Sequence, residues 1–514
     1  MKKIFLQILL LFFAFFCYSQ VSTIDQKALG TKLSEIFEAW GDVPALGIAV
    51  VQNNEIAFEK GYGVLETGKK TKANENTNFA IASNTKAFTA AALAILVDEG
   101  RISWDDKVRK YIPYFELYNP YVSNEMTIID LLCHRSGLKT FSGDLIWYGS
   151  DHSREEVIKR AKYLEPVYGF REKYGYSNIL YLTAGQIVEA VTDTTWDDFL
   201  KHRIFTPLGM NRTNTSVSVN EKLDNVAACH SLVNGKPVAI PYISWDNIAP
   251  AGSINSNVHD ISKWMMLQLN KGEFNGKRIY SEKVSNEMWT AYTPKAVRPV
   301  ATGVESDTHL KSYGLGWELY DFNGYLIVTH NGGYDGMISQ TVLIPELNTG
   351  FVVLTNSLSI MFVAVQNTLI DYLIKGELSS AWSDRYLRVR DMIAEQDKKE
   401  KEEWEKSKIE GTSPAHNFKD YTGVYMSDVY GAVEISLTAD GSLYLKMMHT
   451  PDYQGKITHW HYDTFMVKFD RAISLPEGTV NFISDKYGKV VELQIDIPNP
   501  DFDFTELKLI KQNN

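Results

Sequence analysis

A serine and a lysine three residues apart begin the part of this chain that could do chemistry. Ser83 and Lys86 precede a stretch, 87–100, that is rich in Ala and Leu, has no internal Pro and ends at Gly100. Such a stretch favours a helix, so Ser83 lies at or near its N-terminus and Lys86 about one turn further along the same face. An amine with a depressed pKa can take the hydroxyl proton, and the helix end can stabilise an oxyanion. We therefore predict Ser83 as a nucleophile and Lys86 as its base.

The Ser-x-x-Lys spacing is a weak signal by itself. Ser136-Gly137-Leu138-Lys139 repeats it, but Gly137 follows the serine at once and no long helix comes after. A lone instance is more often a helix cap with a surface lysine, so other polar groups must support the first pair.

A tyrosine and an asparagine provide the second group. Tyr176-Ser177-Asn178 stands just before a predicted helix over 178–192, and side chains two residues apart in extended backbone point the same way. Near the Lys86 ammonium, Tyr176 could ionise more readily and act as a base. Asn178 could orient Lys86 and a substrate amide. Taken alone, Tyr176 would be read as a half-buried aromatic.

The third group is His330-Asn331-Gly332-Gly333, which follows a predicted strand over 324–330. Gly332 and Gly333 at a strand edge would let a substrate backbone approach and add as a strand. The N–H groups of Gly333 and Ser83 could form an oxyanion hole, and His330 could hydrogen-bond the tetrahedral intermediate. A lone histidine at a strand end is usually structural.

Together and in this order, the three groups resemble the motifs of serine β-lactamases and penicillin-binding proteins. Within this family, the chain more specifically resembles the class C branch and its esterase and peptidase relatives. In that branch Tyr-x-Asn is the second motif, and His-x-Gly often replaces Lys-Thr-Gly as the third. It covers roughly residues 30–375. The resemblance implies attack by Ser83, an acyl-enzyme and then hydrolysis by water, with no cofactor.

The chain departs from the β-lactamase pattern in having neither Lys-Thr-Gly nor Ser-Asp-Asn. In the family, the lysine of the third motif helps to bind the carboxylate of penicillins and cephalosporins. His330 cannot supply a permanent charge near pH 7, so peptide or ester substrates are expected. Two alternatives stay open: a β-lactamase or D-alanyl-D-alanine carboxypeptidase, and a non-catalytic peptidoglycan- or partner-binding protein.

Other partners and cofactors have weak support. The net charge of −11 argues against nucleic acid. His459-Trp460-His461-Tyr462-Asp463 echoes a zinc motif, but alternating histidines on a strand are more often plain barrel residues, so no metal is predicted. No Gly-x-Ser-x-Gly elbow is present. The sequence leaves open the oligomeric state and whether Cys133 and Cys229 pair.

The first twenty residues read as a secretory signal peptide. Two lysines precede an apolar run over 4–16, and Cys17-Tyr18-Ser19-Gln20 follows. The run is too short for a comfortable membrane span, and the bulky Phe15 and Phe16 disfavour a lipoprotein anchor at Cys17. We expect a periplasmic or secreted protein with no stable span after cleavage.

Hydrophobic periodicity predicts an α+β domain followed by a small all-β barrel domain. Residues 24–380 should form a β-lactamase-like domain, an antiparallel sheet flanked by helices plus a helical subdomain, whose N- and C-terminal segments share the sheet. Residues 381–415 are expected to be a charged helical linker, and 416–514 a barrel or sandwich that resembles lipocalins. The expected strands before the linker are 45–51, 56–63, 313–320, 324–330, 337–344 and 350–356.

Overall fold

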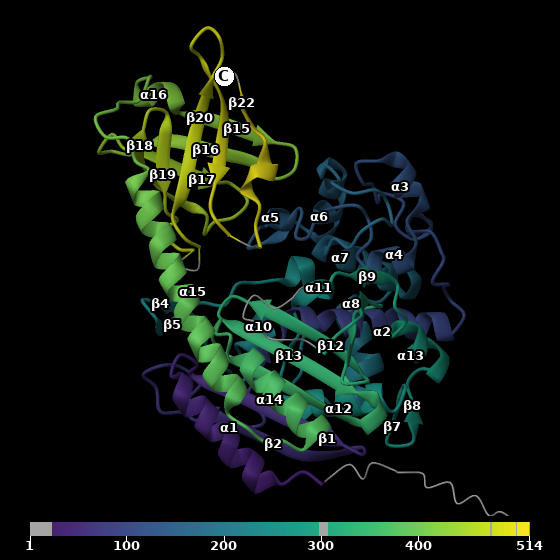
Figure 1. The fold of residues 1–514 in the computed structure, drawn as a ribbon. Helices are drawn as coiled ribbons and strands as arrows, with labels where there is room; N and C mark the ends of the chain where they lie inside the picture. Colours follow the sequence, from purple (N-terminus) through teal and green to yellow (C-terminus); the bar gives the residue numbers. More distant parts are fainter. Residues whose placement is uncertain (1–22, 298–306, 473–474, 500, 513–514) are drawn as a thin grey trace, which may run out of the picture.

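The computed structural model of this chain describes residues 23–297, 307–472, 475–499 and 501–512. The predicted signal peptide, with Cys17, lies outside the described residues. A large mixed domain and a smaller barrel are joined by the long helix α15 (Ala381–Lys406), which runs from the edge of the first to the second (Figure 1). Within the described ranges, no helix is both long and apolar enough to cross a membrane.

The large domain is built on one eight-stranded sheet, and every pair of neighbouring strands in it is antiparallel. The prediction that the two ends of the domain share a sheet is confirmed, because Ile48 of the first strand lies opposite Val353 of the last. From one edge to the other the strands are β2 (Glu55–Gly63), β1 (Ala45–Gln52), β14 (Thr349–Thr355), β13 (Met337–Ile344), β12 (Tyr325–Tyr334), β11 (Glu318–Phe322), β10 (Lys311–Tyr313) and β9 (Thr293–Lys295).

Helices cover both faces of the sheet, which explains why all eight residues of β1 are buried. Leu46, Ile48 and Val50 face a cluster formed with α1 (Gln26–Trp40) and α14 (Met361–Lys375). Ala45, Ala49 and Val51 point to the opposite face and join the larger core, where α12 packs on β1 and β14. The helices of this core include α2 (Thr85–Asp98), α7 (Asn178–Thr192), α11 (Ala249–Gly252) and α12 (Val258–Leu269).

Helix α2 is the buried centre of the domain, with every residue from Thr85 to Leu96 removed from solvent. Its alanines allow close approach of neighbouring helices, and Phe88 stacks on Trp264 of α12 at 3.9 Å between ring centroids. Burial on all sides, rather than an amphipathic stripe, is what an Ala- and Leu-rich helix with so few charges requires.

Two predicted elements differ from the structure. The strand expected over 313–320 is broken into β10 and β11, because the chain turns at Gly316, whose φ is +80°. A Cβ there would lie 2.8 Å from the carbonyl oxygen of Lys86, so the turn presses against the start of α2. In addition, β12 continues to Tyr334, so the His330 motif lies within this strand and does not follow it.

The C-terminal domain is a closed barrel rather than a sandwich. Two of its strands, β18 and β22, were not predicted as strands from the sequence. Trp404 of α15 stacks on Trp460 of the barrel, with ring centroids 4.7 Å apart. The strands are β15 (Gly423–Ser427), β16 (Gly431–Leu437), β17 (Leu443–Met447), β18 (Gln454–His461), β19 (Thr464–Val467), β20 (Gly478–Ser484), β21 (Val490–Asp496) and β22 (Leu509–Lys511).

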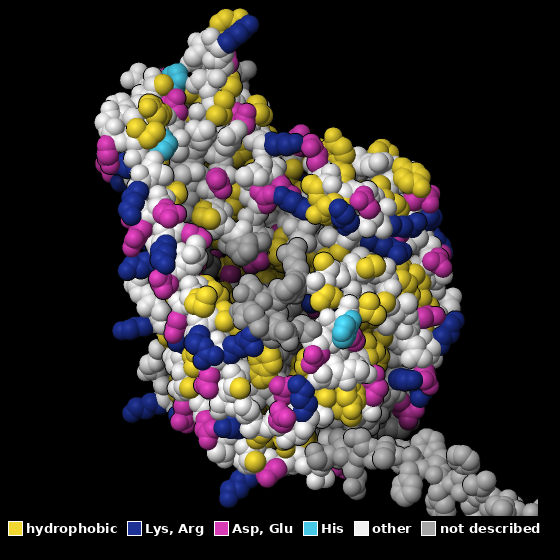
Figure 2. Space-filling model, in the orientation of Figure 1, with side chains coloured by type: hydrophobic (Ala, Val, Ile, Leu, Met, Phe, Trp, Pro, Cys, Tyr) yellow, Lys and Arg dark blue, Asp and Glu magenta, His cyan; other side chains and the backbone are white. Residues whose placement is uncertain are grey.

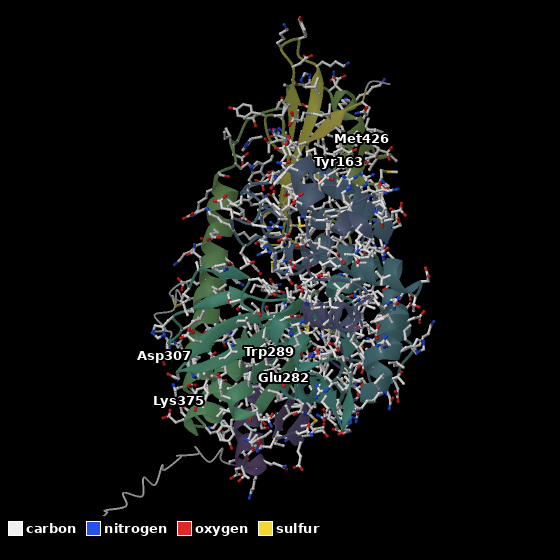
Figure 3. All side chains as sticks on the ribbon, turned by 90° about the vertical axis from the view of Figure 1, so that its right-hand side faces the viewer. Tyr163, Glu282, Trp289, Asp307, Lys375 and Met426 are labelled. Atoms are coloured by element: carbon white, nitrogen blue, oxygen red, sulfur yellow. The ribbon has the colours of Figure 1, made fainter. Side chains whose placement is uncertain are left out.

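The barrel also contacts the helical part of the large domain directly. Ser142 donates a hydrogen bond to Glu506 over 2.7 Å, and Lys139 forms an ion pair with Asp503. Tyr163 and Met426 approach each other at this junction and line one small cleft (Figure 3). The domains therefore meet twice, through α15 and through this contact.

Candidate active site

Ser83 lies in a single 3₁₀ turn (Ala82–Asn84) immediately before α2. Ala82 has a φ of 45°, a left-handed conformation that an alanine rarely adopts. Strand β13 holds this turn: the Ser339 hydroxyl donates to the carbonyl of Ile81 over 2.6 Å and accepts from the amide of Asn84 over 2.7 Å. Strained backbone held in this way is typical of functional sites.

Lys86 is fully buried, and its amine has three partners. Nζ lies 2.7 Å from Asn178 Oδ1, 2.8 Å from the carbonyl oxygen of Ala251 and 3.1 Å from Ser83 Oγ. Burial lowers the pKa of Lys86 well below its ordinary value, and the more distant Asp144 only partly opposes this. The amine is therefore poised to be neutral.

A neutral amine fits these three partners. It has two hydrogens and one lone pair, and a carbonyl or amide oxygen can only accept. When the two hydrogens go to Asn178 Oδ1 and Ala251 O, the lone pair is left for the Ser83 hydroxyl. This is the geometry that a general base needs toward a serine nucleophile.

Tyr176 lies beside both residues. Lys86 Nζ is 4.6 Å from the centroid of its ring, and the Ser83 side chain lies near enough to its phenol to favour the ionised form. Burial nevertheless raises the pKa of Tyr176 well above its usual value. The expectation that this phenol ionises more readily is therefore wrong, and a neutral phenol can instead donate or relay a proton.

Asp144, which the sequence did not single out, completes the group. It begins the short helix α5 (Asp144–Trp147) and accepts hydrogen bonds from Asn178 Nδ2 over 2.7 Å and from Trp147 Nε1 over 2.8 Å. Burial raises the pKa of Asp144 to about 7. By fixing the amide of Asn178, it directs the Asn178 oxygen toward Lys86. No local motif marks Asp144, so only the folded structure reveals it.

His330 is buried and already hydrogen-bonded through both ring nitrogens. Nδ1 lies 2.6 Å from the carbonyl oxygen of Asn331, which can only accept, so Nδ1 carries the proton. Nε2 therefore accepts from the hydroxyl of Tyr313 over 2.7 Å. Burial and the nearby Lys86 lower the pKa of His330 to about 3. To bond a tetrahedral intermediate, as predicted, His330 would have to exchange one of these partners.

Of the two glycines of the third motif, Gly332 lies against the 3₁₀ turn that carries Ser83, and Gly333 faces open space. A Cβ on Gly332 would stand 2.7 Å from the backbone nitrogen of Ser83, so only glycine fits there. Gly333 is exposed, and a Cβ there would meet open space. Strand β11 pairs with β12 only as far as Thr329, opposite Glu318. The edge of β12 beyond Thr329 is therefore left unpaired by β11, where an extended substrate could add as a strand, and the oxyanion hole of Ser83 and Gly333 stays a prediction.

A cavity of about 740 Å³ opens above Ser83, and the surface is hollowed between barrel and large domain (Figure 2). Both domains contribute to its walls. From the large domain come Ser83, Tyr176, Asn178, His330 and Gly333. The barrel supplies Leu475, Asn499, Asp501 and Phe502.

Positively charged and acidic side chains line different parts of the cavity wall. On one side, Lys295 and Lys311 share the single carboxylate of Glu318, which leaves an excess of positive charge there. These cations lie on β9 and β10, outside the third motif, so no motif in the sequence points to them. Elsewhere on the wall, Asp335 accepts from Tyr148, and burial together with Asp501 raises the pKa of Asp335 to about 7.

The remaining sequence candidates lie apart from the cavity. Cys133 and Cys229 are buried free thiols, so they do not pair. His459 and His461 of the zinc-like motif bind other partners, Tyr462 O and the backbone amide of Ile409.

The comparisons with known proteins agree with this architecture. A family model described as Beta-lactamase matches residues 33–373. The chain belongs to the beta-lactamase family. Residues 407–511, which hold the barrel, match a domain of unknown function, DUF3471.

Two curated proteins are similar to this chain in sequence, over alignments of different length. Unguisins hydrolase ungD from Aspergillus violaceofuscus is 29% identical over 451 residues, which cover 80% of this chain and 77% of that protein. Protein flp from Staphylococcus aureus strain COL is 29% identical over 319 residues, or 62% of this chain and 60% of that protein.

Solved structures share the fold. The penicillin-binding protein homologue from Pyrococcus abyssi, described as octameric, gives a TM-score of 0.62 at 24% identity over 95% of this chain and 100% of its own. A D-stereospecific amidohydrolase from Streptomyces sp. gives 0.53 at 20% identity, over 69% of this chain and 100% of its own. At these identities the likeness concerns the fold.

Proposed function

We propose that this protein is an exported serine hydrolase that cleaves an amide or ester bond through an acyl-enzyme on Ser83. The observation that carries the proposal is the buried Lys86 amine, 3.1 Å from Ser83 Oγ, with Asn178 Oδ1 and the carbonyl oxygen of Ala251 as its other two partners. Signal-peptide features in residues 1–20 support export to the periplasm or medium.

The proposed reaction follows from this geometry. Lys86 takes the proton of Ser83 as Oγ attacks the carbonyl carbon, and the backbone N–H groups of Ser83 and Gly333 hold the oxyanion. The proton then passes from Lys86, directly or through the neutral Tyr176 phenol, to the leaving group. A water molecule attacks the acyl-enzyme by the same route and releases Ser83.

Peptide or ester substrates are favoured over β-lactams. The third motif carries a neutral His330 where β-lactamases have a lysine. The names of two similar proteins, a hydrolase of unguisins and a D-stereospecific amidohydrolase, support an amide bond as target. Because Lys295 and Lys311 lie in the cavity wall, substrates with a free carboxylate, including those of a D-alanyl-D-alanine carboxypeptidase, belong in the same screen.

A serine-reactive probe tests the catalytic claim. A fluorophosphonate should label the purified protein, and Ser83→Ala should abolish labelling. Ser136→Ala, the second serine with the same spacing, is the matched control and should label like wild type. Failure of every serine-reactive probe would favour a non-catalytic binding protein. A screen of esters, D-amino-acid peptides and a chromogenic cephalosporin would then identify the substrate class.

A further inference from the structure

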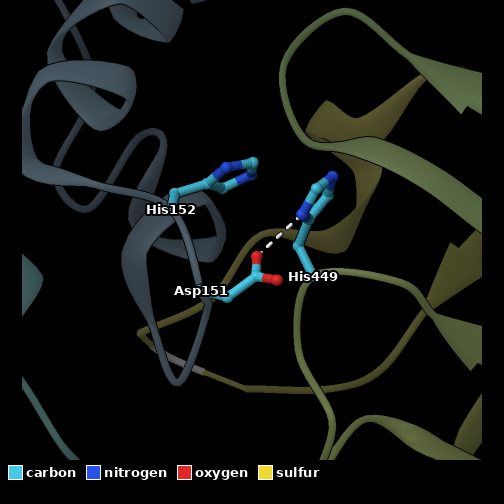
Figure 4. A group of neighbouring side chains, drawn as sticks. All are labelled: Asp151, His152 and His449. Atoms are coloured by element: carbon cyan, nitrogen blue, oxygen red, sulfur yellow. Dashed lines mark hydrogen bonds and ion pairs between the residues drawn. The ribbon is translucent and has the colours of Figure 1, made fainter.

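Two histidines and an aspartate gather where the barrel meets the large domain, apart from the residues that line the Ser83 cavity. Asp151 and His152 lie between α5 and α6 (Arg154–Arg160), and His449 lies in the loop between β17 and β18 (Figure 4). One ligand atom from each lies within 4.8 Å of the other two. Asp151 and His449 are 298 positions apart, so no spacing in the sequence could reveal the group.

The two loops that carry these residues are held together by their main chains. The backbone N–H of Asp151 donates to the carbonyl of His449 over 3.0 Å, and the Asp151 carboxylate lies 2.8 Å from His449 Nδ1. The side chains are therefore placed by the backbone and not only by their own contact. Such preorganisation is what a metal site needs.

His152 is oriented as metal-binding histidines are. It is buried, with 7% of its surface exposed, and its Nε2 lies 3.1 Å from the carbonyl oxygen of Tyr430. Since a carbonyl only accepts, Nε2 carries the proton and Nδ1 keeps its lone pair. A backbone carbonyl that fixes the tautomer in this way is the usual outer partner of a metal-bound histidine. The rings of His152 and His449 face each other with centroids 4.1 Å apart.

We propose that Asp151, His152 and His449 bind a borderline divalent cation of the Zn²⁺ class that fastens the barrel to the large domain. Two imidazoles and one carboxylate are ligands that Zn²⁺ accepts, whereas Ca²⁺ and Mg²⁺ prefer oxygen ligands throughout. With bonds of about 2.0–2.1 Å, tetrahedral ligand atoms stand about 3.4 Å apart, so side-chain shifts of about 1 Å complete the site. Asp151 is mostly exposed, which leaves the fourth position to water.

The site would be structural. It lies just beyond α5, the helix that carries Asp144 and Trp147 into the wall of the Ser83 cavity. A cation there would hold the barrel loops against the element that orients Asn178. This role is independent of the reaction proposed for Ser83, because none of the three ligands lines that cavity.

Metal binding by the full-length mature chain tests the proposal. Protein stripped with EDTA is titrated with Zn²⁺ by calorimetry, and Co²⁺ is used to record the visible absorption of a tetrahedral site. Wild type should bind one Zn²⁺ and gain thermal stability with it. Asp151→Asn, which keeps the shape of an exposed side chain, and His449→Ala should each weaken binding at least about tenfold.

His459→Ala provides the matched control, since His459 is a barrel histidine outside the cluster whose ring bonds Tyr462 O. This variant should bind Zn²⁺ like wild type. Hydrogen exchange locates the site independently: Zn²⁺ should slow exchange in peptides spanning 149–152 and 447–453 in wild type but not in Asp151→Asn. Equal Zn²⁺ binding by wild type and Asp151→Asn, or no stoichiometric binding by wild type, would overturn the proposal.

Discussion

The pattern Ser-x-x-Lys occurs twice in this chain, at Ser83–Lys86 and at Ser136–Lys139, with opposite surroundings. Lys86 is fully buried and contacts two uncharged oxygens and the serine hydroxyl. Lys139 is about one-third exposed and pairs with two carboxylates of the barrel, Asp503 and Glu506. Among the described residues, Lys86 forms no ion pair with a carboxylate, whereas Lys139 forms two.

The two serines differ as well. Ser136 Oγ accepts a backbone N–H from Leu138 over 3.3 Å, as a turn-forming hydroxyl does. Ser83 stands at the start of a buried helix, next to an amine with a lowered pKa. With identical spacing, Lys139 thus binds the barrel through ion pairs, whereas Lys86 is placed to act as a base. The environment, rather than the pattern, decides the chemistry, and paired substitutions can test this.

The largest expected effect is the difference in kcat between variants of the two serines. Ser83→Ala should lower kcat at least about 10³-fold, because the covalent route is lost while the cavity stays intact. Ser136→Ala removes only one turn hydrogen bond, so kcat should stay within about twofold and unfolding free energy should fall by about 1 kcal/mol or less. Turnover of the best screened substrate and denaturant unfolding measure the two effects. Similar losses of kcat in both variants would contradict the comparison.

Substitutions of the two lysines should differ nearly as much in their effect on the acylation rate. Lys86→Met removes the base and should lower the acylation rate about 10²- to 10⁴-fold. Because Asn178 Oδ1 and Ala251 O lose their donor, it should also cost about 1–3 kcal/mol of stability. Lys139→Met should leave acylation within about threefold, since Lys139 contacts the barrel and not the nucleophile. The rate of labelling by a fluorophosphonate, which phosphonylates the same serine oxygen, measures how strongly the nucleophile is activated. A Lys86→Met protein that labels at the wild-type rate would remove Lys86 from the mechanism.

Much of this site is visible in the sequence because its parts obey local rules. The Ala- and Leu-rich stretch after Ser83 predicts a helix, and the extended backbone before α7 places Tyr176 and Asn178 on one side. The strands themselves are visible in the same way, as an apolar hairpin at one end of the domain and an alternating pattern at the other. These features depend on residues close together in the chain.

The features that could not be predicted from the sequence depend on contacts between distant segments of the chain. The break at Gly316 exists because β10 and β11 turn against the start of α2, over 200 residues away in the chain. The raised pKa of Tyr176 and the role of Asp144 come from burial, which no motif encodes. The barrel residues that line the cavity, such as Phe502, could be placed only once the docking of the two domains was known.

A smaller effect is expected at Asp144, which supports the first lysine and has no counterpart at the second. Asp144→Asn should keep a hydrogen-bonding group of the same size but let the Asn178 amide turn, so its oxygen no longer faces Lys86 in every molecule. We expect a fall of about tenfold in kcat with little change in KM. Asp501→Asn, a cavity carboxylate that does not touch Asn178, is the control. Equal losses of kcat would indicate a general charge effect.

The smallest effect is a difference in how stability depends on pH. The folded-state pKa of Lys86 lies well below its ordinary value of 10.5. Between these two values the unfolded chain binds one more proton than the folded chain, so the free energy of unfolding rises with pH, by at most about 1.4 kcal/mol per unit. Lys86→Met removes this contribution and should flatten the curve in the pH range below 10.5. If the Lys86→Met slope matched that of wild type, the buried amine would be charged in the folded protein, and it could not accept the Ser83 proton.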